Sequence, residues 1–145
     1  LFQTPQLEAT FGGGECNVAV SLSNYGVSSS FVSAVPANNI GDACLQEIRR
    51  YGVDTRFVKR QGERLGIYYL ETGSNQRPSK VTYDRAYSSI ATAKKGDFDW
   101  DAILDGVEWF HITGITPALS EQRSRWSDRD LKGKPQRLAQ RDDAV

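Results

Sequence analysis

Hydrophobic residues at helical spacing predict two amphipathic helices in the first third of the chain. Val18 and Leu22 lie on one face of the first helix, which we expect over residues 17–25. The second helix is expected over residues 42–51, with Asp42 as its N-cap. A glycine follows each segment directly, as is common after the last turn of a helix.

Short β-rich runs follow the helices in turn. The run at residues 30–35 ends at a proline and predicts a strand, and residues 53–59 lead into another. Further along, a short helix is expected over residues 99–106 and a strand over residues 107–113. Strands that alternate with helices favour a parallel α/β sheet with right-handed crossovers.

One region interrupts this alternation. Residues 65–71 and 80–85 are both β-rich, and the polar loop between them contains Gly73 and Pro78. Two such runs separated by turn residues predict a β-hairpin that stands apart from the alternating sheet.

A glycine-rich turn precedes the first helix and is the most informative stretch of the sequence. Gly12, Gly13 and Gly14 let the backbone bend sharply and let a ligand approach the peptide, because glycine has no Cβ. Asn17 then places an amide, both donor and acceptor, at the start of the helix. Helix N-termini also stabilise anions. The glycines by themselves favour a tight strand-to-helix turn that binds nothing, because glycine-rich turns are common.

The wider sequence resembles the PfkB (ribokinase-like) family of carbohydrate kinases. The segment Thr10–Val20 is similar to the N-terminal signature of that family, and Phe31–Cys44 continues the pattern, with Gly41 and Asp42 at its expected end. Within the family, the segments Arg64–Glu71, Val81–Ala86 and Trp109–Ser120 most resemble 2-keto-3-deoxygluconate kinases. The resemblance covers residues 1–120.

The resemblance implies a fold and an assembly. The fold would be a ribokinase-like, Rossmann-like parallel sheet with helices on both faces and a small β lid, incomplete because the C-terminal half of the domain is absent. Residues 1–120 would form the N-terminal part of the domain, with lid strands at about 1–12 and 57–86. The lid strands of this family often pack between subunits, so we expect a homo-oligomer, because unpaired strand edges favour such pairing.

The resemblance also implies a reaction. Such a kinase transfers a phosphoryl group from Mg-ATP to 2-keto-3-deoxygluconate, a small sugar acid. Arg85 suits the carboxylate, because a guanidinium can hold it with two parallel hydrogen bonds. Tyr83 lies two residues away on the same strand face, and Tyr69 on the partner strand could face both. The substrate-binding residues implied by the resemblance are Gly13, Gly14, Asn17, Tyr69, Tyr83, Arg85 and Ile115.

Several of these side chains could instead have purely structural roles. The tyrosines could serve hairpin packing alone, and Arg85 could be a surface residue. We expect His111 to be a buried structural histidine, and Trp100 and Trp109 to belong to the core.

The amino-acid composition limits the classes of protein to which the chain could belong. Eighteen basic and eighteen acidic residues give no net charge, so no global charge favours nucleic acid or a membrane surface. Cys16 and Cys44 lie in apolar helical patterns and are expected to be buried free thiols of a reducing compartment, the cytoplasm by default. With one histidine and no Cys-x-x-Cys pair, a metal site has almost no support. No run of apolar residues is long enough to span a bilayer.

The last 25 residues differ from the rest. Residues 121–145 hold seven of the eighteen basic residues and no periodic apolar pattern, so we expect a disordered tail. One hypothesis for its origin is a stretch read out of frame, and the competing one is an unrelated tail. A basic tail could contact nucleic acid, but five interspersed acidic residues favour a solvated segment.

The resemblance also predicts motifs that the sequence does not contain. The family's catalytic base lies in a Gly-Ala-Gly-Asp-like turn, and no Gly-x-Gly-Asp follows residue 120. The expectation is a chain with no catalytic residue and no ATP site of its own, inactive alone. The alternative is a non-catalytic module that binds a sugar acid or pairs with other subunits.

Overall fold

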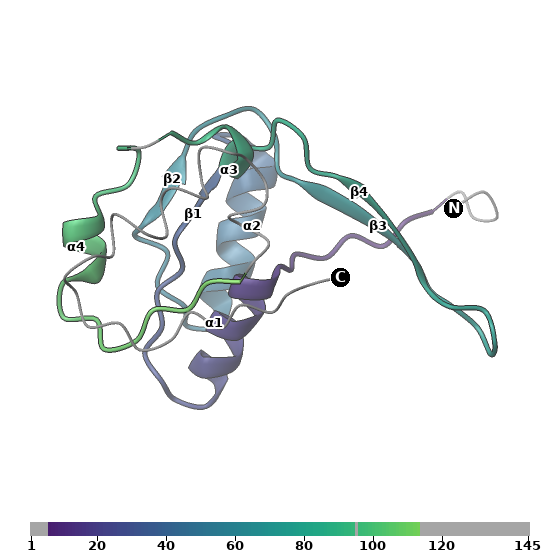
Figure 1. The fold of residues 1–145 in the computed structure, drawn as a ribbon, viewed down its shortest axis with the longest axis horizontal. Helices are drawn as coiled ribbons and strands as arrows, with labels where there is room; N and C mark the ends of the chain where they lie inside the picture. The colour runs from purple at the N-terminus through teal and green to yellow at the C-terminus, as the bar shows by residue number, and fades with distance from the viewer. Residues whose placement is uncertain (1–5, 95, 114–145) are drawn as a thin grey trace.

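The computed structural model describes residues 6–94 and 96–113. Two strands and their covering helices form the body, and a long hairpin projects from it (Figure 1). The elements in chain order are α1 (Gly14–Asn24), β1 (Ser33–Val35), α2 (Asn39–Arg50), β2 (Val58–Arg60), β3 (Ile67–Glu71), β4 (Lys80–Asp84), α3 (Ser89–Thr92) and α4 (Trp100–Leu104). The expected 121–145 tail lies outside the described residues.

The body contains the predicted parallel sheet. β1 pairs with β2 in parallel, and Ser33 lies opposite Val58. Ala34 and Val35 are 2% and 3% exposed although they point to opposite faces of the strand. Burial of both faces is characteristic of parallel sheets, and the prediction of a parallel α/β sheet is confirmed.

Helices cover both faces of this small sheet, as the sequence predicts. On one face, Val35 and Val58 form a buried cluster with Cys16 of α1 and with Cys44 and Ile48 of α2. On the other face, Ala34 packs with Phe98 near α4 and with Ile103 of α4, and Trp100 adds to this cluster from its edge. The strands therefore lie between two helical layers.

The start of α2 differs from the prediction. The N-cap is Asn38, whose side-chain oxygen accepts a hydrogen bond from the Gly41 N–H at 3.1 Å. Asp42 lies within the first turn, and its carboxylate pairs with Arg60 at 2.6 Å. The pattern places the helix three residues too late because the buried apolar positions begin only at Cys44, and Ile40 in the first turn is exposed.

The hairpin forms as expected, but its strands are shorter than predicted. β3 and β4 are antiparallel, with Tyr68 opposite Tyr83 and Tyr69 opposite Thr82. Residues 58–60 form β2, which pairs with β1 in the parallel sheet and not with the hairpin. The bounds of the lid stay a prediction. Residues 6–13 carry no strand, and residues 1–5 lie outside the described residues.

The segment before residue 114 also differs from the prediction. Residues 107–113 form no strand and pair with no strand among the described residues. Phe110 packs edge-on against Trp100, with ring centroids 5.9 Å apart, but Trp109 is 53% exposed rather than part of the core. An apolar run becomes a strand only where a neighbouring strand pairs with it.

No helix in the described part of the chain is long and apolar enough to cross a membrane.

Candidate functional site

The glycine turn passes directly into α1. The helix begins at Gly14, earlier than predicted, because the Gly13 carbonyl already accepts the Asn17 N–H at 2.7 Å. The Asn17 side-chain oxygen accepts a second bond, from the Gly13 N–H at 3.4 Å. Asn17 therefore folds back over the turn, and no side chain caps the helix at Gly13.

The hairpin presents one aromatic and cationic face. Tyr68 and Tyr83 are direct cross-strand neighbours, with ring centroids 6.4 Å apart. The Arg85 guanidinium lies 4.0 Å from the centre of the Tyr83 ring, a cation–π contact. Among the described residues, no carboxylate pairs with Arg85. This face therefore carries two phenol groups and a cation that no described carboxylate neutralises.

The placement of Tyr69 corrects the sequence analysis. Tyr69 pairs with Thr82, so it points to the opposite face of the hairpin from Tyr83 and Arg85. The prediction that it faces them is wrong, and Tyr68 takes that place. Counting the antiparallel register back from Tyr83 across the loop would have identified Tyr68, but the sequence does not define which residues of the loop form the turn.

The glycine turn lies beside this face of the hairpin. A Cβ at Gly12 would be 3.6 Å from the Asn17 side-chain oxygen and 3.7 Å from the Tyr68 hydroxyl. In Figure 1 the amino-terminal segment runs from α1 towards the hairpin. Asn17 and Tyr68 therefore meet at Gly12, and the absence of a side chain there leaves room between them.

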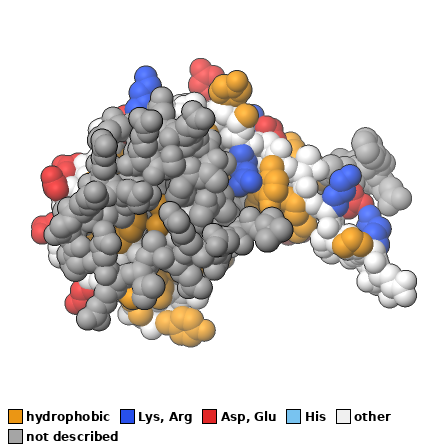
Figure 2. All heavy atoms as spheres, in the orientation of Figure 1, with side chains coloured by type: hydrophobic (Ala, Val, Ile, Leu, Met, Phe, Trp, Pro, Cys, Tyr) orange, Lys and Arg blue, Asp and Glu red, His pale blue; other side chains and the backbone are white. Residues whose placement is uncertain are grey.

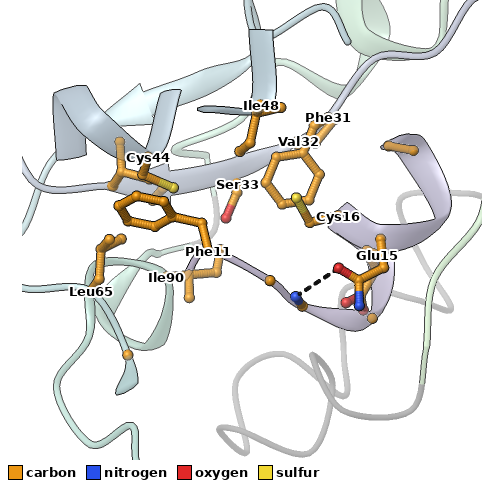
Figure 3. A pocket seen from close by; sticks show the side chains of 18 of the residues that line it. Phe11, Glu15, Cys16, Phe31, Val32, Ser33, Cys44, Ile48, Leu65 and Ile90 are labelled. Carbon is orange, nitrogen blue, oxygen red and sulfur yellow. Dashed lines mark hydrogen bonds between the residues drawn. The ribbon is translucent and has the colours of Figure 1, made fainter. Parts of the chain in front are cut away.

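These groups line a broad concave region of about 2300 Å³. Small-molecule pockets usually measure about 300–1,000 Å³, so one sugar would fill only part of it. Figure 3 shows Phe11, Cys44 and Leu65 projecting into it from the amino-terminal segment, α2 and the segment before β3. The described residues of the predicted site that line it are Gly13, Gly14, Asn17, Tyr69, Tyr83 and Arg85. Ile115 lies outside the described residues.

A polar junction holds the base of the hairpin. The Arg64 guanidinium donates to the Asp84 carboxylate at 2.6 Å and to the Asp84 carbonyl at 3.1 Å. This bond lowers the pKa of Asp84 below its ordinary value. On the body side, the Ser89 N–H and hydroxyl both donate to the Arg64 carbonyl. Arg64 therefore links the hairpin to the start of α3.

The two thiols are buried and free, as predicted. Burial raises the pKa of Cys16 to about 11, with smaller contributions from Cys44 and Glu15. Burial also raises the pKa of Cys44. A protonated, buried thiol is a poor nucleophile, so these cysteines act as small core residues. No cluster of potential metal ligands occurs in residues 6–94 and 96–113.

The concave region contains one contact that was not predicted, and one residue, His111, that is less buried than predicted. Glu15 accepts two hydrogen bonds from Thr113, one from the backbone N–H at 3.2 Å and one from the hydroxyl at 2.7 Å. His111 is partly buried, and its buried Nε2 has no hydrogen-bond partner within the described part of the chain. The Glu15–Thr113 contact spans 98 positions, and no local sequence pattern indicates such a pairing.

Comparison with known proteins decides the family. The sequence profile of the pfkB family carbohydrate kinases matches residues 1–124. This chain belongs to that family. The chain is 38% identical over 115 residues to the 2-dehydro-3-deoxygalactonokinase of Haloferax volcanii, a match that covers 79% of this chain and 36% of the relative.

Solved structures of the family show the same fold. The crystal structure of 2-dehydro-3-deoxygluconokinase from Thermotoga maritima superposes with a TM-score of 0.87 at 48% identity, over 91% of this chain and 40% of that one. A sugar kinase from Pyrococcus horikoshii, solved in complex with ATP, superposes with a TM-score of 0.70 at 23% identity, over 83% and 40% of the two chains. The chain thus spans well under half the length of these relatives.

Proposed function

We propose that this chain provides the sugar-binding and lid part of a kinase that transfers a phosphoryl group from ATP to 2-keto-3-deoxygluconate, which is also called 2-dehydro-3-deoxygluconate. The hairpin face of Tyr68, Tyr83 and Arg85, placed beside the glycine turn, carries this proposal. The relatives from Thermotoga maritima and Haloferax volcanii, named for the gluconate and galactonate forms of this sugar acid, support the substrate class.

The chemistry of the face suits a sugar acid. Arg85 would hold the carboxylate with two parallel hydrogen bonds, since no carboxylate of the described chain pairs with it. Tyr68 and Tyr83 would bond hydroxyl or keto oxygens through their phenol groups. Asn17, at the glycine turn, would bond the opposite side of the sugar. Gly13 would let the sugar approach the backbone, and Gly14 would contribute through the turn that it forms with Gly13.

The ATP and magnesium that the family implies have no evident place in this part of the chain. The described residues contain no cluster of carboxylates to hold a metal ion, and the sequence after residue 120 contains no Gly-x-Gly-Asp turn. When bound to a kinase, Mg-ATP supplies the phosphoryl group and neutralises its charge. The groups described here bind and orient the acceptor, and we expect no ATP-dependent turnover from this chain alone.

Binding of the sugar acid tests the proposal directly. Isothermal titration of the chain with 2-keto-3-deoxygluconate should show saturable binding, and Arg85→Ala should weaken it by about 10- to 100-fold, because a hydrogen-bonded charge contributes about 1.5–3 kcal/mol. Gluconate, which lacks the keto group, serves as a control ligand. The absence of any binding by the wild-type chain would contradict the proposal.

A matched pair of tyrosine variants tests which face of the hairpin meets the sugar. Tyr68→Phe and Tyr69→Phe each remove one hydroxyl from adjacent positions of β3, on opposite faces. We expect the larger loss of affinity, about five- to tenfold, from Tyr68→Phe, because a neutral hydrogen bond contributes about 1 kcal/mol. A larger loss from Tyr69→Phe would place the sugar on the other face.

The alternative is that the chain is a non-catalytic module that associates through its lid strands. Leu70 and Val81 extend the exposed apolar face of the hairpin away from the body, and Figure 2 shows hydrophobic side chains along this projection. An exposed apolar face with free strand edges favours pairing with a second hairpin. Sedimentation should give a dimer that Leu70→Glu converts to a monomer, with Lys80→Glu on the other face as control. A wild-type monomer at all concentrations would exclude this assembly.

A further inference from the structure

We infer that Glu15 is a positioning residue for the sugar site, and that it acts by tying the start of α1 to Thr113. The inference rests on the proposed function. Its basis is the pair of hydrogen bonds that the Glu15 carboxylate accepts from the Thr113 N–H and hydroxyl. Figure 3 shows Glu15 on the first turn of α1, beside the residues that line the pocket.

The start of α1 has few other anchors. No side chain caps the helix at Gly13, and only Cys16 and Ala19 of α1 are buried. Gly12, Gly13 and Gly14 precede or begin the helix and contribute no side-chain packing. A turn of this composition would sample many conformations if nothing held it. The Glu15–Thr113 contact supplies a long-range constraint at that point.

The first turn of α1 leaves room for Thr113. A Cβ at Gly14 would lie 3.2 Å from the Thr113 Cγ2 atom, closer than most such contacts, so a glycine lets Thr113 approach the helix. The Glu15 carboxylate also lies in the first turn of α1, where a negative charge is favourable. Gly14 and Glu15 thus together accommodate Thr113.

Short contacts connect the Glu15–Thr113 pair to the residues that we propose bind the sugar. Asn17 lies one helical turn from Gly13 and bonds the Gly13 N–H. Gly12 lies between the Asn17 side chain and the Tyr68 hydroxyl. A shift at the start of α1 would therefore move Asn17 relative to the hairpin face. A misplacement of about 1 Å in such a site can change function by about two orders of magnitude.

Variants of the contact separate its positioning role from simple stabilisation. Glu15→Ala removes both acceptor bonds, whereas Glu15→Gln keeps an oxygen that can accept both, loses the charge and replaces the second carboxylate oxygen with an NH2 donor. Thr113→Val removes the hydroxyl donor and keeps the N–H. Glu47→Ala is the matched control, an acidic residue on the surface of α2 that pairs with Arg50. Each variant is titrated with 2-keto-3-deoxygluconate, and its melting temperature is recorded.

We expect Glu15→Ala to weaken sugar binding by about tenfold, Thr113→Val by less, and Glu15→Gln and Glu47→Ala by less than about threefold. In the Glu15→Ala background, Thr113→Val should add little, because the two residues act as one pair. Hydrogen exchange at the Thr113 amide should become faster in Glu15→Ala and stay slow in Glu15→Gln.

Four outcomes would overturn the inference. If Glu15→Ala lowers the melting temperature but the folded protein keeps its affinity, Glu15 is structural only. If exchange at the Thr113 amide is unchanged, the contact does not hold the segment. If the wild-type chain binds no sugar acid, the proposed function fails together with this role. Wild-type binding that Arg85→Ala weakens and Glu15→Ala does not would overturn the role of Glu15 alone.

Discussion

The body and the hairpin both consist of short β-strands, yet they are built in opposite ways. β1 and β2 have three residues each, and β1 is buried on both faces between helices. β3 and β4 have five residues each, and most of their side chains are exposed. Strand length therefore does not indicate where the stability of this molecule lies. Burial does, because apolar area removed from water is the main favourable contribution to folding.

The same comparison explains where the proposed site lies. The body supplies the glycine turn and α1, and the hairpin supplies Tyr68, Tyr83 and Arg85 from an element that few buried contacts hold. Elements with few buried contacts open most easily. A ligand between the two regions would then meet the body on one side and the more easily displaced hairpin on the other.

The largest expected effect is the loss of stability caused by a core substitution in the body, compared with one on the hairpin. Ile48 is 3% exposed in the core cluster, and Leu70 on the hairpin is 55% exposed. Ile48→Ala should lower the free energy of unfolding by about 2–5 kcal/mol, because it removes buried methyl groups and leaves a cavity. Leu70→Ala should change it by less than about 0.5 kcal/mol. Urea unfolding of the two variants checks the contrast, and similar losses at both positions would refute it.

A second contrast lies within the body, between two glycines. A Cβ at Gly41 would lie 2.1 Å from the Pro36 carbonyl oxygen, whereas a Cβ at Gly26 would meet nothing within 4 Å. Gly41→Ala should cost about 2–3 kcal/mol through overpacking, despite the better helix propensity of alanine. Gly26→Ala should cost only about 1 kcal/mol, from its positive φ. Thermal unfolding of both variants measures the difference, and equal losses would mean that α2 shifts away from Pro36.

A third prediction concerns alkaline pH and again affects the body. The pKa of Cys16 is raised from 9.0 to about 11 in the folded protein, mainly by burial. Because the folded-state pKa lies above the unfolded one, this stabilisation is complete below pH 9 and is lost as the pH rises towards 11. The loss should approach about 2 kcal/mol. Urea unfolding at pH 8 and pH 10.5 measures it.

The matched control is Cys16→Ala. That variant should lose less stability between the two pH values than the wild type, because tyrosine and lysine side chains titrate equally in both proteins. An identical loss in the two proteins would show that the Cys16 thiol does not contribute.

The fold was more predictable from the sequence than the site. The β-rich run around residue 33 and the apolar spacing of α2 define elements whose burial is local, so the parallel sheet and its helices could be predicted. In α1 the buried residues are Cys16 and Ala19, whereas Leu22, from which that helix was predicted, is 36% exposed. Tyr68 could not be distinguished from Tyr69, because a one-residue change in hairpin register reverses every side chain. The Glu15–Thr113 contact depends on tertiary structure alone, and no periodic pattern reports it.

The smallest expected effect belongs to the hairpin and tests how it is attached to the body. The hydrogen bond from Arg64 lowers the pKa of Asp84, so the pair contributes above the ordinary carboxyl pKa and is lost as the pH falls through the lowered value. Both side chains are partly exposed, so salt should weaken the pair. Arg64→Met should return the Asp84 pKa towards its ordinary value in a carboxyl NMR titration. Arg56→Met, on the body, should leave the Asp84 pKa unchanged. If Arg64→Met does not move that pKa, the Arg64–Asp84 pair does not secure the hairpin, and the Ser89 bonds to the Arg64 carbonyl would be its main attachment to the body.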